Sequence, residues 1–163
     1  YPKLAGQHST VLIKQIADIR ARVRETSGMH SFVMELRDPR DIADVAAYIE
    51  GLCIPPGNGR YILPDREQQI ADGRQMFTRD CADCHQAQGQ GNKEKGYPVL
   101  AGQHYRYLLR QMQDIRDGYR QNGDPNMAKA IAKYKNDSLQ GMAAFLSSLE
   151  TPGLPCVPAQ SRK

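Results

Sequence analysis

The sequence has no tryptophan and only three phenylalanines, and it lacks any apolar run of the roughly 18 residues that suggest a membrane-spanning helix. Its most apolar stretches, such as residues 42–54, are short and amphipathic, so we expect no transmembrane segment. No run of lysine and arginine exceeds two residues and the formal charge is only +4, which argues against nucleic-acid binding. The period-two alternation typical of strands is also missing. What remains is a helical chain with few aromatic core residues, whose missing apolar bulk a bound cofactor could supply.

An internal repeat organises the chain. Residues 1–8 read YPKLAGQH and residues 97–104 read YPVLAGQH, so that seven of eight positions match. Two further pairs of segments correspond, residues 14–20 with 110–116 and residues 42–52 with 139–149. The chain therefore contains two copies of one unit.

A stretch rich in proline and glycine separates the two copies. Residues 53–64 suit a linker, which predicts a first unit over 1–52 and a second unit over 65–163. Each unit has apolar residues at i, i+3 and i+4, as amphipathic helices do. One further helix is predicted from about Asp65 to Arg79, with Asp65 as its N-cap. The predicted fold class is all-α, with two small tandem domains.

One motif carries chemistry. The pattern CxxCH occurs once, with its cysteines at Cys81 and Cys84 and its histidine at His85. Two thiols one helical turn apart can add to the haem vinyl groups, and the histidine that follows can bind the iron. A zinc site would need a second pair of ligands at short spacing, and Cys53 and Cys156 are isolated. A redox dithiol would need a βαβ context. The motif predicts covalent haem c and one-electron transfer.

A methionine after the motif is the expected iron ligand on the other face of the haem. Met127 is the best candidate, because it follows a turn at residues 124–126 that lets its side chain point inward from irregular backbone. Met112 and Met142 have helical apolar spacing, which favours core packing. The alternative ligand is His104, which would give a bis-histidine haem.

Three other positions have open roles. The carbonyl of Pro98, 13 residues after His85, could accept a hydrogen bond from Nδ1 of that histidine, or the proline could simply stiffen its loop. Cys53 and Cys156 each follow the last helix of a unit, so they could form a disulfide or stay as free thiols. Of the remaining histidines, His8 is interpreted as a helix-start residue. His30 is interpreted as an exposed loop residue, with a ligand role in the first unit as the alternative.

Together these features resemble the dihaem class I cytochromes c of the cytochrome c4 type, in which two cytochrome folds are joined in tandem. The resemblance covers nearly the whole chain and rests on the CxxCH motif, both YPxLAGQH segments and the closing segments 41–48 and 141–145. It implies one haem per unit with His and Met ligands, in a periplasmic electron carrier that is not an enzyme. The implied partners are a quinol-cytochrome c reductase, a terminal oxidase or a dehydrogenase.

The first unit departs from this pattern because it has no CxxCH motif. Counted back from Tyr1 as Cys81 is from Tyr97, the motif would lie upstream of the sequence. The chain starts with tyrosine and has no leader, so we expect that an N-terminal piece has been removed. The first unit keeps a candidate iron ligand, Met29, with Met34 as the alternative, and a domain without haem would not need one. We therefore expect an incomplete first unit rather than a lost haem.

Two other functions stay open. A cytochrome subunit bound permanently to a dehydrogenase or oxidase complex would show an exposed apolar patch, and a dihaem enzyme would have open iron coordination. For a carrier, five lysines near the second haem are candidate docking contacts, with a solvated face as the alternative interpretation: Lys93, Lys95, Lys129, Lys133 and Lys135.

Overall fold

The computed structural model describes residues 1–24, 26, 28–54, 59–153 and 156. Within these ranges the chain is helical, with no strand and an isolated bridge between Asn92 and Tyr97. One group of helices comprises α1 (Ser9–Arg20), α2 (His30–Met34) and α3 (Pro39–Glu50). The other comprises α4 (Arg66–Asp80), α5 (Ala82–His85), α6 (Tyr105–Arg116), α7 (Pro125–Ile131) and α8 (Asn136–Ser148). The all-α prediction is confirmed.

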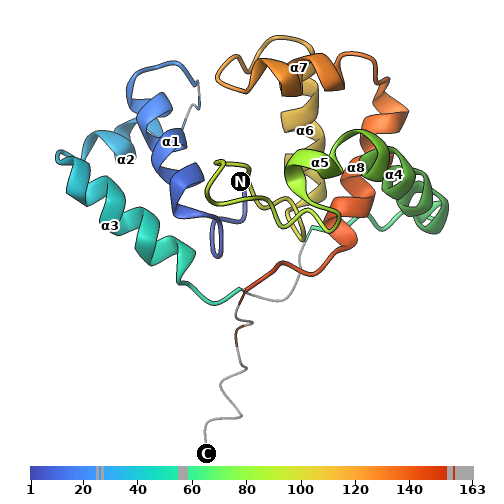
Figure 1. Cartoon of the computed structure of the whole chain (residues 1–163), viewed down its shortest axis with the longest axis horizontal. Helices are drawn as coiled ribbons and strands as arrows, with labels where there is room; N and C mark the ends of the chain where they lie inside the picture. Colours follow the sequence, from blue (N-terminus) through green and yellow to red (C-terminus); the bar gives the residue numbers. More distant parts are fainter. Residues whose placement is uncertain (25, 27, 55–58, 154–155, 157–163) are drawn as a thin grey trace, which may run out of the picture.

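The two groups of helices lie side by side, with non-helical segments between them (Figure 1). Residues 55–58 of the expected linker and residues 157–163 of the expected C-terminal tail lie outside the described residues. None of the helices that the structure describes is long and apolar enough to cross a membrane.

The second group is built around the crossing of α4 and α8. Two glycines meet there: a Cβ added to Gly73 would lie 1.9 Å from the carbonyl oxygen of Gly141, so the backbones touch. Phe77 and Phe145 pack beside the crossing, with 5.7 Å between ring centroids. Met112 and Met142 are buried in the same core, which confirms their prediction as packing residues.

The start of α4 differs in detail from the prediction. Asp65 occupies the N-cap position, but its side chain makes no capping hydrogen bond. Its carboxylate instead accepts from the hydroxyl of Tyr61 at 2.8 Å and from the amide of Gln69 at 3.2 Å. Side-chain partners four residues before and after Asp65 have therefore replaced the backbone cap.

The first group has a smaller core, centred on Ile16, Ile19 and Val33. Its helix α3 buries little surface, since only Ala46 is fully buried, whereas the equivalent α8 buries residues 141–147. The reason is that α4 covers α8, while no described helix covers α3 in the same way.

The repeated segments hold the two groups together through a pair of glutamines. The amide of Gln7 donates to the carbonyl of Val99 at 3.0 Å and accepts from its N–H at 2.9 Å. The amide of Gln103 does the same with Lys3, at 2.8 and 2.7 Å. Because Gln7 matches Gln103 in the repeat and Lys3 matches Val99, the contact is approximately two-fold symmetric.

A second set of polar contacts joins α1 and the residues just after it to α6 and the residues just after it. Arg24 donates to Gln111 at 3.1 Å, and Arg120 donates to Gln111 and Gln15 at 2.7 and 3.2 Å. Burial, followed by the positive charge of Arg24, lowers the pKa of Arg120 to about 10. Asn122 completes the set by donating to Gln15 at 3.1 Å.

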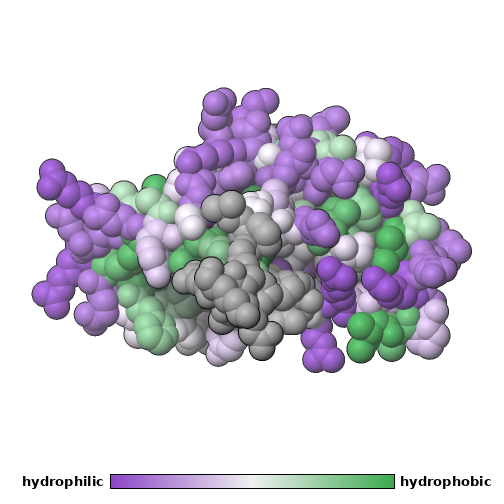
Figure 2. Space-filling model, turned by 90° about the horizontal axis from the view of Figure 1, so that it is seen from below, coloured by the Kyte–Doolittle hydropathy of each residue, from purple (hydrophilic) through white to green (hydrophobic). Residues whose placement is uncertain are grey.

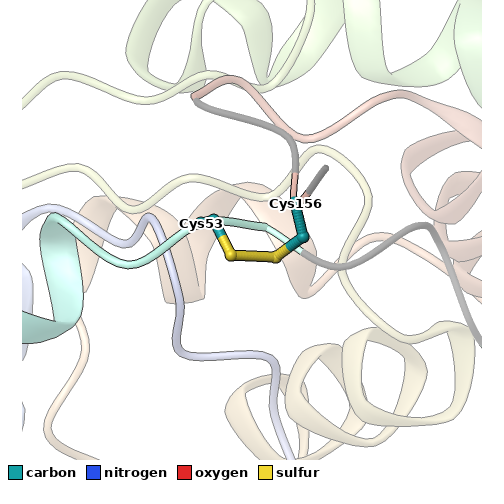
Figure 3. The surroundings of a disulfide bond; sticks show 2 residues. All are labelled: Cys53 and Cys156. Carbon is teal, nitrogen blue, oxygen red and sulfur yellow. A yellow bond between two sulfur atoms is a disulfide. The ribbon is translucent and has the colours of Figure 1, made fainter. Parts of the chain in front are cut away.

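Cys53 and Cys156 form a disulfide, with 4.9 Å between their Cα atoms (Figure 3). The backbone N–H of Cys156 also donates to the carbonyl of Ile54 at 2.9 Å. The alternative of two free thiols is therefore excluded. The bond ties the end of the first unit to the chain beyond α8.

Candidate haem site

The haem-attachment motif spans the junction of two helices. Cys81 follows the last residue of α4, and α5 carries Cys84 and His85. The N–H of His85 donates to the carbonyl of Cys81 at 3.0 Å, which winds the motif into a single turn. Both cysteines are free thiols, with Cys81 half-buried and Cys84 exposed. The two thiols are thus presented one helical turn apart.

Burial raises the pKa of the Cys81 thiol to about 11, and the negative charge of Asp80 adds to the shift. Cys81 and the neighbouring Ala82 pack against the core of the second group. The thiol of Cys81 is therefore protonated at neutral pH, and the residue packs against apolar groups of the core.

His85 is buried, with 8% of its surface exposed. Its Nδ1 lies 3.4 Å from the carbonyl oxygen of Pro98. A carbonyl can only accept, so this contact places the proton on Nδ1 and leaves Nε2 as the nitrogen for a metal. Burial lowers the pKa of His85, although the Pro98 carbonyl acts in the opposite direction. The imidazole is thus neutral, the form that binds iron.

The loop after His85 depends on glycine to reach Pro98. Gly91 has a φ of +71°, and its N–H donates to the carbonyl of His85 at 3.0 Å. A Cβ at Gly91 would lie 2.4 Å from the carbonyl oxygen of Tyr97. Only glycine allows this close return of the chain.

Met127 lies in the first turn of α7, so the prediction that it projects from irregular backbone is wrong. Asp124 caps the helix by accepting from the N–H of Asn126 at 2.7 Å, and Pro125 occupies the first turn. An Asp-Pro pair is a helix-start signal as well as a turn signal, and here the helix forms. Met127 is half-buried and packs against the same core as Cys81.

The methionines of the first unit lie at the two ends of α2. Met29 is at the N-cap and 36% exposed, and Met34 is the last residue and 47% exposed. Between them, Val33 is buried. His30 begins α2 and is half-buried, so its prediction as an exposed loop residue is wrong.

The two histidines of the repeated segments are both helix-start residues. His8 is the N-cap residue of α1 and His104 that of α6, which confirms the interpretation made for His8. Nε2 of His8 lies 3.0 Å from the carbonyl oxygen of Gln90, in the other unit.

The donor set fits covalent haem better than a bare metal ion. Cys53 and Cys156 are joined to each other, so they cannot serve as zinc ligands. Among the residues that the structure describes, no three His, Cys, Asp or Glu side chains are grouped to hold a metal ion. Two free thiols and one neutral imidazole on a single turn are what haem attachment requires.

Two of the five predicted docking lysines are engaged in ion pairs. Lys93 lies 2.7 Å from a carboxylate oxygen of Glu50, and Lys133 lies 3.1 Å from one of Asp80. All five are exposed: Lys93, Lys95, Lys129, Lys133 and Lys135.

The sequence does not predict the hydrogen bond from the hydroxyl of Tyr134 to the carboxylate of Asp80. The aspartate adjoins the motif, but its partner Tyr134 is 54 positions away, and no spacing rule links them.

Comparison with known proteins gives consistent matches. The cytochrome c family model matches residues 70–150. Cytochrome c4 of Pseudomonas aeruginosa is 33% identical, over 91% of this chain and 76% of that protein. The crystal structure of reduced recombinant cytochrome c4 from Pseudomonas stutzeri matches with a TM-score of 0.79 at 31% identity, covering 92% of this chain and 85% of that one. Thiosulfate dehydrogenase from Marichromatium purpuratum matches with a TM-score of 0.76 at 30% identity, covering 91% of this chain but 33% of that one.

Proposed function

The chain belongs to the cytochrome c4 family of electron-transfer haem proteins, and from this premise we propose that it is a periplasmic one-electron carrier and not an enzyme. The observation that carries the proposal is the turn that presents Cys81 and Cys84 beside the buried, neutral His85. Haem c, when bound, supplies an iron that gains and loses one electron. The disulfide between Cys53 and Cys156 supports the periplasm, because such bonds persist in oxidising compartments.

The chain's own residues have distinct tasks in this proposal. Cys81 and Cys84 would hold the haem covalently, and His85 would supply a nitrogen ligand to its iron. Pro98 orients the imidazole through its carbonyl, which keeps the proton on Nδ1. Met127 would supply the sulfur ligand, and the apolar core that it packs against would exclude water. Sulfur ligation and an apolar pocket both favour the reduced state.

For the first unit we propose Met29 as the iron ligand of a second haem. Its distance in sequence from the start of α3 is close to that of Met127 from the matching position of α8. The intact mass of the native protein counts the haems directly. Two haem masses are expected, and a single one would refute a haem in the first unit.

Carriers of this kind meet their partners through the haem edge. We propose that electrons enter from a quinol-cytochrome c reductase or a dehydrogenase and leave to a terminal oxidase. Exposed Lys95, Lys129 and Lys135 would steer docking to acidic surfaces, so association should weaken as salt rises.

A permanent subunit of a dehydrogenase is the second candidate function. The match to one third of the Marichromatium thiosulfate dehydrogenase chain favours it. A permanent subunit should expose a large apolar patch, whereas the face in Figure 2 is mainly hydrophilic outside the grey atoms, with hydrophobic residues in separate small groups. Purification from the native source separates the candidates, because a permanent subunit would elute with a dehydrogenase and a carrier would not.

Substitution of Met127 tests the iron site. In Met127→Ala the oxidised protein should lose the weak sulfur-to-iron absorption band at the red edge, and its reduction potential should fall. Met112→Leu is the control, since Met112 is a buried core residue and the band should survive. A band that persists in Met127→Ala would refute the assignment.

A further inference from the structure

Asp80 gathers three donors directly beside the haem-attachment motif. It is the last residue of α4 and precedes Cys81. Its carboxylate accepts a hydrogen bond from the hydroxyl of Tyr134, and it lies 3.1 Å from the ammonium of Lys133 and 3.0 Å from the guanidinium of Arg79. The Asp80 side chain is only 17% exposed, so these charge-assisted contacts are partly sheltered from water.

Two of these donors come from the segment that joins α7 to α8. Tyr134 is buried in the core, while the ammonium of Lys133 lies 5.3 Å from the centroid of its ring. The carbonyl of Tyr134 accepts from Arg116 at 3.2 Å, which attaches the segment to α6 as well. The segment that follows the Met127 helix is therefore tied to the rest of the unit largely through Tyr134.

The contact with Asp80 is not a feature of the repeat. In the correspondence of residues 42–52 with 139–149, Lys133 and Tyr134 match Leu36 and Arg37. Neither of these can reproduce a phenol and an ammonium directed at one carboxylate. The contact is made by the residue that directly precedes Cys81, which favours a role connected with the haem-attachment turn.

We propose that Asp80 is a positioning residue, whose carboxylate clamps the α7–α8 segment onto the haem-attachment turn and so keeps Met127 on the iron. The proposal rests on Met127 being an iron ligand, as given under the proposed function. The clamp acts on the segment and not on the iron itself. Its removal should therefore let the ligand leave more often, with the haem still attached at Cys81 and Cys84.

The test is the rate at which cyanide binds to the oxidised holoprotein, because cyanide can bind only when the methionine has left. Asp80→Asn should raise that rate about tenfold or more, since it removes the charge from three hydrogen-bonded contacts. Tyr134→Phe keeps the buried ring but removes one donor, and should raise the rate by a smaller factor. Asp83→Asn is the matched control: it removes the same charge from an exposed side chain between the two cysteines of the motif. Its rate should stay within about twofold of the wild type, as expected for a surface change.

A second readout follows the segment itself. Hydrogen exchange of residues 127–136 in the holoprotein should be faster in Asp80→Asn than in Asp83→Asn. Equal cyanide rates in these two variants, or equal exchange, would overturn the clamp while leaving the ligand assignment intact. A wild type that binds cyanide as fast as Met127→Ala would instead overturn the ligand assignment, and the clamp with it.

Discussion

The crossing of α4 and α8 provides a sharp test of the fold, through the substitution Gly73→Ala. The added Cβ would lie 1.9 Å from the carbonyl oxygen of Gly141 and 2.8 Å from the N–H nitrogen of Met142. These are backbone atoms in a helix, so no side-chain rotation can relieve the clash. Ordinary contact begins at 3.4 Å, and the helices would have to separate by roughly 1.5 Å.

The magnitude follows from two opposing effects. Overpacking of a core costs about 1–3 kcal/mol, and a backbone clash belongs at the upper end. Alanine in place of a helical glycine contributes about 1 kcal/mol in the other direction. Gly73→Ala should therefore lower the free energy of unfolding by about 2 kcal/mol.

Gly141→Ala is the matched control, because it is the same change on the facing helix. Its Cβ would meet the carbonyl oxygen of Gln69 at 3.2 Å and the methyl of Met76 at 3.3 Å, which small shifts can relieve. The helical preference of alanine offsets that strain, so the free energy of unfolding should change by less than about 1 kcal/mol.

Urea unfolding of the holoprotein, followed by far-ultraviolet circular dichroism, measures both variants. The midpoint should fall in Gly73→Ala with an unchanged slope, which marks a change in stability and not in the extent of unfolding. If both variants unfolded at the same urea concentration, the close contact of the two backbones would be refuted.

Two further predictions concern the disulfide and the contact between the units. Replacing both Cys53 and Cys156 by serine should lower the free energy of unfolding by about 2–5 kcal/mol, because the bond closes a loop across a separation of 103 residues; a urea midpoint unchanged from wild type would contradict this. Burial raises the pKa of Asp18, but hydrogen bonds from Lys14 and Asn122 outweigh it and hold the pKa below its usual value. The stabilisation that Asp18 provides is therefore present above the unfolded pKa of about 3.9 and is lost as the pH falls through the lower folded pKa. Asp18→Asn should flatten the dependence of the urea midpoint on pH below about 4. An unaltered dependence would argue against the hydrogen bonds from Lys14 and Asn122 to Asp18.

Much of the haem site could be predicted because its chemistry is local. Cys81, Cys84 and His85 are contiguous on one turn, so their spacing alone places two thiols and an imidazole together. The core roles of Met112 and Met142 followed from helical periodicity in the same way. Met127 shows where local reasoning stops. Asp124 and Pro125 suit a turn and a helix start equally, and in the structure they start α7, in which Met127 packs against the core.

By itself, the sequence determined the attachment turn, the two-copy organisation and the helical class, since each depends on residues that are close along the chain. Only the tertiary structure decided which distant groups meet: Cys53 with Cys156, Gln7 with Val99, and Asp80 with Tyr134. The physical reason is that such pairs form only after the helices have packed. Hydrogen bonds and charges act over a few ångströms, and no local pattern records which side chains packing will bring within that range.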